Sequence, residues 1–140
     1  MKSKHLFAIR ISLFLCAILL LSSCAKKIVL NNTGIAPAAQ AYAKIKQGKD
    51  KNYEIEVKAT HLAPSMKLNP PKSTYVIWMV TDINGTKNIG QFQSGTSLLS
   101  KTLKGSIKTI TSFKPISFFI TAEDEAGINY PGNMIILKSY

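Results

Sequence analysis

Arginine, cysteine, histidine and tryptophan are all scarce in this chain of 140 residues. Its two cysteines, Cys16 and Cys24, are too few for a disulfide-stapled scaffold. Beyond residue 24 the only histidine is His61, which we expect to be structural or solvated, because no second histidine or free thiol is available to complete a zinc site. No serine lies in a nucleophile-elbow motif. The sequence therefore predicts no metal, no cofactor, no catalytic residue and no enzyme activity.

A hydrophobic run long enough to cross a membrane is also missing. The longest apolar run covers residues 11–21 and follows a basic start that contains Lys2, Lys4 and Arg10. A membrane span needs about 20 apolar residues, whereas an export signal needs a core of roughly 7–15. We therefore expect residues 1–23 to form a signal helix that is removed, with an uncleaved N-terminal anchor as the alternative.

The apolar run is followed by Leu21-Ser22-Ser23-Cys24, which resembles the lipobox of bacterial lipoproteins. The resemblance implies transfer of diacylglycerol to the Cys24 thiol and cleavage between Ser23 and Cys24. Two or more acyl chains, palmitate for example, hold a protein stably on a bilayer. Ala25 is not the aspartate that retains lipoproteins at the inner membrane in some lineages, which favours the outer membrane, facing the periplasm.

Acidic residues are few, with seven Asp and Glu against 18 Lys and Arg. Residues 1–23 hold three of the basic residues and none of the acidic ones, so residues 24–140 keep fifteen lysines and a net charge of +8. Such charge usually indicates nucleic-acid binding. Export argues against a nucleic-acid partner, and the absence of arginine beyond Arg10 removes bidentate recognition of bases and phosphates. We interpret the lysines as a source of solubility and of affinity for an anionic envelope surface.

No stretch of ten residues or more shows helical periodicity, and from residue 40 onward apolar residues alternate with polar ones. Alternation with period two predicts β-strands that bury one face. Lysines of the first strand should face glutamates of the second. Seven short strands predict an all-β chain, an antiparallel immunoglobulin-like β-sandwich, with a five- or six-stranded barrel as the alternative. The expected strands cover 40–46, 53–59, 74–81, 87–93, 99–110, 116–122 and 134–137.

Residues 24–39 contain little to bury, and we expect them to form a tether between the membrane and a sandwich domain over 40–140. In an immunoglobulin-like topology the loops 61–73 and 123–132 fall at one end of the sandwich. We expect the tether to join the domain at that same end. The opposite end, away from the membrane, should then carry residues 48–51, 82–86 and 112–115.

Four segments occur in an order that resembles the extracytoplasmic C-terminal domain of anti-sigma-K factors. They are the runs YVIWMV at 75–80, IGQF at 89–92, FITAED at 119–124 and YPGNMII at 130–136. The resemblance covers roughly residues 74–137 and implies a sandwich outside the cytoplasm with a sensory or partner-binding role. The zinc-binding helical domain and the membrane helix of such factors are not found in this sequence, so anti-sigma activity is not expected.

One acidic cluster, Glu123-Asp124-Glu125 with Asn129 nearby, offers oxygen ligands in a loop. Its spacing is not that of an EF-hand, and a solvated turn paired with lysines is the simpler interpretation. We treat these four residues as a possible binding loop without a metal. Trp78, the only tryptophan, lies in the most apolar strand, where we expect it to pack between the two sheets.

These observations predict a membrane-anchored lipoprotein of the cell envelope whose sandwich is a non-enzymatic binding or structural module. Its expected partners are the membrane, through the lipid on Cys24, and an unidentified envelope protein or glycan. The alternative function is an accessory or sensor in an anti-sigma-like envelope signalling system.

Overall fold

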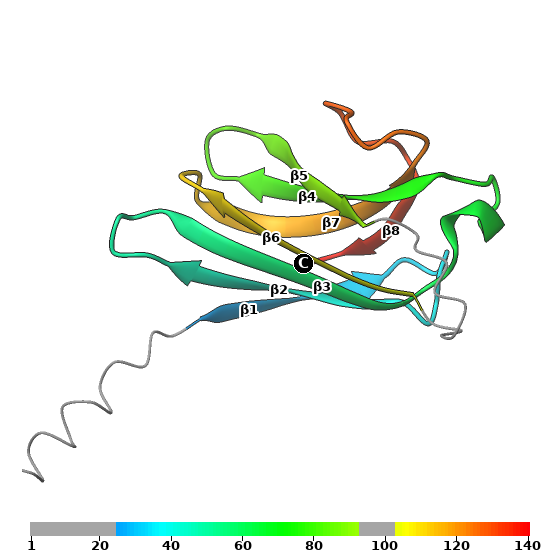
Figure 1. Ribbon diagram of the computed structural model, residues 1–140, viewed down its shortest axis with the longest axis horizontal. Coiled ribbons are helices and arrows are strands. Elements are labelled where there is room, and N and C mark those ends of the chain that lie inside the picture. The colour runs from blue at the N-terminus through cyan, green and yellow to red at the C-terminus, as the bar shows by residue number, and fades with distance from the viewer. Residues whose placement is uncertain (1–24, 93–102) are drawn as a thin grey trace, which may run out of the picture.

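Antiparallel β-strands form nearly all of the regular secondary structure in the computed structural model, which describes residues 25–92 and 103–140 (Figure 1). A single 3-10 turn, η1 (Ser65–Lys67), interrupts the strands of the described chain. The strands are β1 (Lys26–Asn32), β2 (Gln40–Gln47), β3 (Tyr53–Leu62), β4 (Thr74–Thr81), β5 (Thr86–Phe92), β6 (Leu103–Thr111), β7 (Pro115–Glu123) and β8 (Ile135–Lys138).

Neighbouring strands are hydrogen-bonded in the spatial order β5-β4-β7-β8-β1-β2-β3-β6, and this sheet curls into two facing layers (Figure 1). In one layer β2, β3 and β6 take the places of strands A, B and E of an immunoglobulin domain. In the other, β4, β7 and β8 take the places of C, F and G, and β5 is added beside β4. The predicted all-β sandwich with immunoglobulin-like pairing is confirmed.

The first predicted hairpin forms with the expected register. Lys44 lies opposite Glu56 and Lys46 opposite Glu54, so lysines of β2 face glutamates of β3. The inward positions of both strands are buried aliphatic residues, and the alternation places all four charged residues on the other face. The pairing therefore follows directly from the alternating sequence.

The expected tether over 24–39 is wrong for residues 26–32, which form β1 and bring the count in the described chain to eight strands. Residues Lys26–Leu30 pair with β2, and Asn31 and Asn32 pair with β8 at the edge of the other layer. Leu30 is only 2% exposed and belongs to the core. The strand was missed because its buried side chains are few and its second partner, β8, lies about 100 residues away in sequence.

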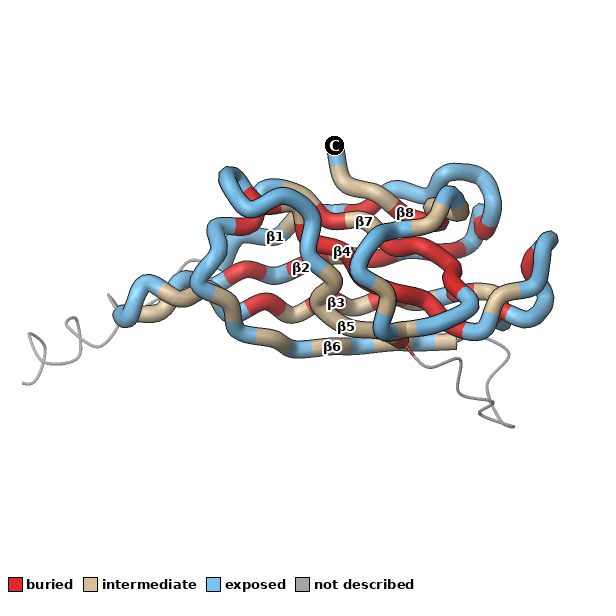
Figure 2. The backbone as a smooth tube through the Cα atoms, turned by 90° about the horizontal axis from the view of Figure 1, so that it is seen from above, coloured by how far each residue is buried: buried red, intermediate tan, exposed pale blue. Residues whose placement is uncertain are grey.

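Trp78 does not pack between the sheets, which corrects the expectation for this residue. Tyr75, Ile77 and Met79 of β4 belong to the main core, so the alternating Trp78 points to the opposite face of its sheet, and yet it is fully buried. There its ring stacks on Phe119 with a centroid separation of 6.1 Å. Figure 2 shows the buried residues along the strands and the exposed ones in the connections at both ends.

The segment that follows β7 covers this outer cluster. The side-chain amide of Asn88 on β5 donates to the carbonyls of Ala126 and Ile128, at 2.8 and 3.0 Å, and so fastens the segment to the sheet. In Figure 1 the orange chain passes above β4 and β7. Both faces of β4 are therefore buried, as expected for an unbroken apolar strand, but by two different partners.

Glycine allows the two layers to approach along the open edges, β5 and β6. A Cβ on Gly105 of β6 would lie 2.5 Å from the ring of Phe92 on β5. Gly90 of β5 has φ +140°, and its missing side chain leaves room for Ile107 of β6. The pairing of β4 with β5 shifts by one residue beside Gly90, as expected for a bulge.

The loops 61–73 and 123–132 lie at one end of the sandwich, as predicted, and the backbone N–H of Ser73 donates to the carbonyl of Glu123 at 2.9 Å. The chain does not enter at that end, however, which corrects the expectation. Lys26 pairs with Ile45, near the end of β2, because β1 runs antiparallel to β2. Ala25 therefore lies at the other end, with the turns that had been expected to face away from the membrane.

Candidate functional site

The four residues of the predicted binding loop do not act together. Glu123 is only 6% exposed, and its Oε1 accepts the backbone N–H of Gly132 at 2.7 Å, so its carboxylate fastens the covering segment. Asp124 forms an ion pair with Lys72 at 2.7 Å. Glu125 and Asn129 are exposed.

Metal ligands are not gathered at this loop or elsewhere in residues 25–92 and 103–140. No three His, Cys, Asp or Glu side chains in these ranges come close enough together to hold an ion. His61 is exposed, with φ 56° at an irregularity of β3, and its Nδ1 lies 3.3 Å from the hydroxyl of Thr60. The predicted lipidation and cleavage residues, Cys24 and Ser23, lie outside the described residues.

Buried polar groups near the loops stabilise the scaffold. The hydroxyl of Tyr75 donates to the carbonyl of Ala63 at 2.6 Å, and burial raises the pKa of Tyr75 to about 12. The indole N–H of Trp78 donates to Thr121 Oγ1 at 2.8 Å. Both bonds satisfy groups that would otherwise be buried without a partner.

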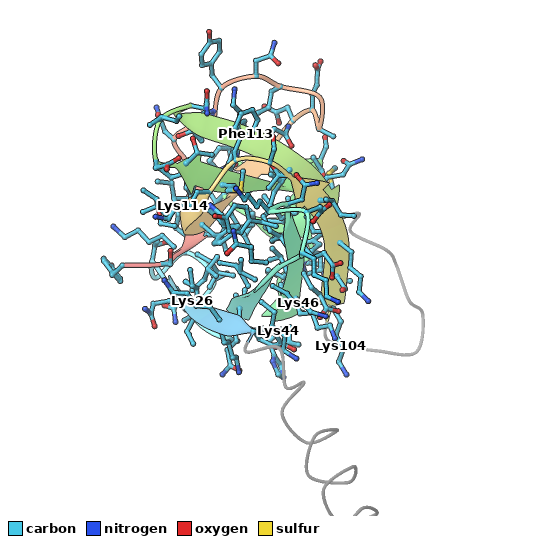
Figure 3. All side chains as sticks on the ribbon, turned by 90° about the vertical axis from the view of Figure 1, so that its left-hand side faces the viewer. Lys26, Lys44, Lys46, Lys104, Phe113 and Lys114 are labelled. Atoms are coloured by element: carbon cyan, nitrogen blue, oxygen red, sulfur yellow. The ribbon has the colours of Figure 1, made fainter. Side chains whose placement is uncertain are left out.

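Lysines gather instead on the outer face of the layer formed by β1, β2, β3 and β6. We call this surface the lysine face, and it consists of Lys27, Lys44, Lys46, Lys58, Lys104 and Lys108. These side chains alternate with inward-facing residues along their strands. Only two carboxylates, Glu54 and Glu56, share the face, which leaves an excess of four positive charges. Figure 3 labels Lys44, Lys46 and Lys104 of this face.

Glu56 lies at the centre of the lysine face and is surrounded by ammonium groups. Its Oε1 is 3.1 Å from Nζ of Lys58 and 3.8 Å from Nζ of Lys108. The hydrogen bond from Lys58 lowers the pKa of Glu56, and the same bond raises the pKa of Lys58. Glu56 therefore remains ionised and holds the lysines in place, while the outlying ammonium groups carry the excess charge.

Tyr42 adds an aromatic surface to the same face. Lys27 Nζ lies 4.4 Å from the centre of its ring and Lys44 Nζ lies 5.7 Å from it, which are cation–π distances. An aromatic ring beside two ammonium groups suits a ligand that carries both anionic groups and an apolar face.

A hollow of about 580 Å³ opens beside these residues. Three lysines and two glutamates line it together with Ile110 and with Ala25, the first described residue; the charged residues are Lys44, Lys46, Lys108, Glu54 and Glu56. Most of the surface that lines the hollow is apolar, and its ammonium groups exceed its carboxylates by one positive charge. Its lysines can bind a negatively charged group. The contacts would be those of point charges, because lysine lacks the bidentate geometry of arginine.

The sequence contained part of the signal for this face. Alternating lysines were visible on 40–46, but the placement of Lys104 and Lys108 beside Lys58 depends on pairing between β3 and β6, which are about 50 residues apart. The lysine face was therefore predicted as general surface charge and not as a site.

Comparisons with protein-family models, with curated proteins and with solved structures find no match for this chain. Within its described portion, no helix has the length and hydropathy needed to cross a membrane.

Proposed function

We propose that this chain is a non-enzymatic lipoprotein of the cell envelope, held on the membrane by acyl chains on Cys24 and binding an anionic envelope glycan through its lysine face. The observation that carries the proposal is the position of Ala25 in the lysine-lined hollow, one residue after the lipobox cysteine. An anchor at Cys24 would hold this face close to the membrane, among the charged polymers of the envelope.

The carboxylates of the described chain support binding over catalysis. Glu123 fastens the covering segment, and Asp124 is paired with Lys72. Asp50 and Asp82 accept hydrogen bonds from backbone N–H groups of their own turns. These four carboxylates are thus engaged in structural contacts.

A glycan with repeated negative groups fits the spacing of the lysine face. Lys27 on β1 and Lys44 on β2 occupy paired positions of neighbouring strands, which are separated by about 4.8 Å. Successive outward positions on one strand, such as Lys44 and Lys46, are about 7 Å apart. A chain with phosphates or carboxylates at such intervals would contact several ammonium groups at once.

The lipid anchor is tested by mass spectrometry of the N-terminal peptide from the membrane fraction. We expect a peptide that begins at an acylated Cys24, and we expect Cys24→Ser to release the protein from the membrane. An unmodified N-terminus on a membrane-bound chain would contradict the proposal.

Glycan binding is tested by sedimentation of the acylated protein, in detergent, with purified cell-wall sacculi. We expect binding that weakens as salt is raised and that is strongly reduced by Lys44→Gln with Lys108→Gln. Lys58 still neutralises Glu56 in this variant. The matched control, Lys67→Gln with Lys138→Gln, removes the same charge elsewhere. Equal loss of binding in both variants would show that binding depends only on total charge, and it would contradict a site on the lysine face.

The anti-sigma-like resemblance leaves envelope signalling as the second candidate function. Nothing among the described residues favours it over glycan binding, so the binding role is preferred.

A further inference from the structure

Three turns and the start of β1 form one end of the sandwich, which we call the proximal end. The turns are those of residues 48–52, 82–85 and 112–114. Tyr53 at the start of β3 pairs with Thr111 at the end of β6, and Thr81 at the end of β4 pairs with Pro115. All three turns therefore lie together with Ala25, and Figure 3 views the molecule from this side.

Large apolar side chains are exposed at the tips of this end. Ile83 is 85% exposed in the β4–β5 turn, Phe113 is 36% exposed in the β6–β7 turn, and Ile116 beside it is 53% exposed. With Ile110 near the end of β6, they make up four of the nine large hydrophobic residues exposed in the described chain. Ile83 and Phe113 lie in turns, Ile110 and Ile116 in the adjoining ends of β6 and β7, and exposed apolar side chains at one end of a sandwich suit an interaction surface.

Lysines surround these tips. They are Lys26, Lys46, Lys49, Lys51, Lys87 and Lys114. Lys87 Nζ lies 5.4 Å from the centre of the Phe113 ring, so an ammonium group lies directly beside an apolar tip. The acidic side chains nearby are Asp50, Glu54 and Asp82, and both aspartates accept hydrogen bonds from their own turns. Six lysines against three acidic residues give the proximal end a net positive charge.

The chain that precedes the sandwich leaves from this end as well. Strand β1 begins at Lys26, two residues after Cys24. Two residues span at most about 7 Å, which is about the depth of the headgroup region of a bilayer. An acylated Cys24 would therefore hold the proximal end at the membrane surface.

We propose that the proximal end docks on an anionic bilayer, with Ile83 and Phe113 inserted at the boundary between headgroups and acyl chains and the surrounding lysines on the headgroups. This inference rests on the proposed lipidation of Cys24 and assigns a second contact to the same membrane. Exposed aromatic and aliphatic side chains flanked by lysine are the composition of interfacial membrane contacts. Docking fixes the orientation of the sandwich and sets the loops 61–73 and 123–132 farthest from the lipid.

The test uses single cysteine labels on the acylated protein. Cys16 lies in the signal segment and Cys24 carries the lipid, so the mature chain offers no other thiol. Ile83→Cys, Phe113→Cys and, as the control at the opposite end, the 85%-exposed Tyr130→Cys are each labelled with a polarity-sensitive fluorophore. The proteins are reconstituted in phosphatidylethanolamine vesicles that contain phosphatidylglycerol and lipids with quenchers in their acyl chains.

We expect blue-shifted emission and several-fold stronger quenching for the labels at positions 83 and 113 than for the label at 130. Replacing Lys49 and Lys114 by Gln should weaken the quenching, whereas Lys67→Gln should not. Equal, water-like emission from all three labels on vesicle-bound protein would overturn docking and leave the lipid anchor standing. If the mature protein carries no acyl group and does not bind vesicles, both membrane docking and the lipid anchor are overturned. Shielding of positions 83 and 113 that appears without lipid and rises with protein concentration would assign this end to a second copy of the chain.

Discussion

The indole N–H of Trp78 on β4 donates to the hydroxyl of Thr121 on the neighbouring β7, at 2.8 Å and out of contact with solvent. This bond lies on the outer side of the sheet, beneath the segment that follows β7. We expect Thr121→Val, which keeps the shape and removes the acceptor, to lower the free energy of unfolding by about 1–3 kcal/mol. Urea unfolding followed by the fluorescence of the single tryptophan measures the loss. Thr86→Val, at an exposed position, should be nearly neutral; an equal loss in both would contradict the role of this bond.

Glu123 should control how firmly the covering segment is attached. Glu123→Ala removes the acceptor of the Gly132 N–H, and we expect it to cost about 1–3 kcal/mol, since a partly buried donor loses its partner. Limited proteolysis should also cut residues 124–134 faster. Exposed Glu125→Ala serves as the control and should leave both measurements near those of the parent chain. Unchanged proteolysis of the Glu123 variant would contradict the assigned role.

Alkaline stability should depend on Tyr75. Burial raises its pKa to about 12 in the folded chain, above the value of about 10 for an exposed tyrosine. The hydroxyl form is therefore favoured by folding, and its contribution is complete below pH 10 and is lost as the pH rises toward 12. We expect Tyr75→Phe to be less stable than the parent at pH 8, because the bond to Ala63 is lost, and to show a smaller decline between pH 10 and 12. Parallel curves of unfolding free energy against pH would contradict this linkage.

Strand β1 should behave as part of the domain and not as a tether. Leu30→Ala opens space in the core, and we expect it to cost about 2–5 kcal/mol. Val29→Ala, at the neighbouring position that is 57% exposed, should change stability by much less. Thermal unfolding of the two variants provides the comparison. If Leu30→Ala leaves the stability unchanged, residues 26–32 behave as a tether and this prediction is contradicted.

Local alternation was sufficient to predict much of the fold. The β2–β3 hairpin follows from lysines and glutamates that occupy alternate positions on adjacent segments. The burial of β4 on both sides follows from its unbroken apolar run over Thr74–Thr81. The turn after β4 was also predictable from adjacent residues: Asn84-Gly85 predicts a tight turn, and Gly85 has φ 68°. These features depend on neighbours in the chain, so they can be read from it.

The features that the sequence left undetermined depend on distant partners. An unbroken apolar strand does not reveal which of its faces meets the other sheet, so the placement of Trp78 required the structure. The pairing of β1 with β8 and of β3 with β6 joins segments that are far apart in sequence. The first pairing places the end of β1 at the edge of the other layer, and the second gathers the lysine face.

The amino-acid sequence by itself determined the strand-rich composition of the domain and its excess of lysine, and it contains the lipobox-like run at residues 21–24 on which the proposed anchor rests. Only the tertiary structure decided that the lysines gather on one layer and that exposed apolar turns lie at the end where Ala25 enters. The physical reason is that periodicity sets which side of a strand is buried, whereas the order of strands in a sheet is set by contacts across the whole chain.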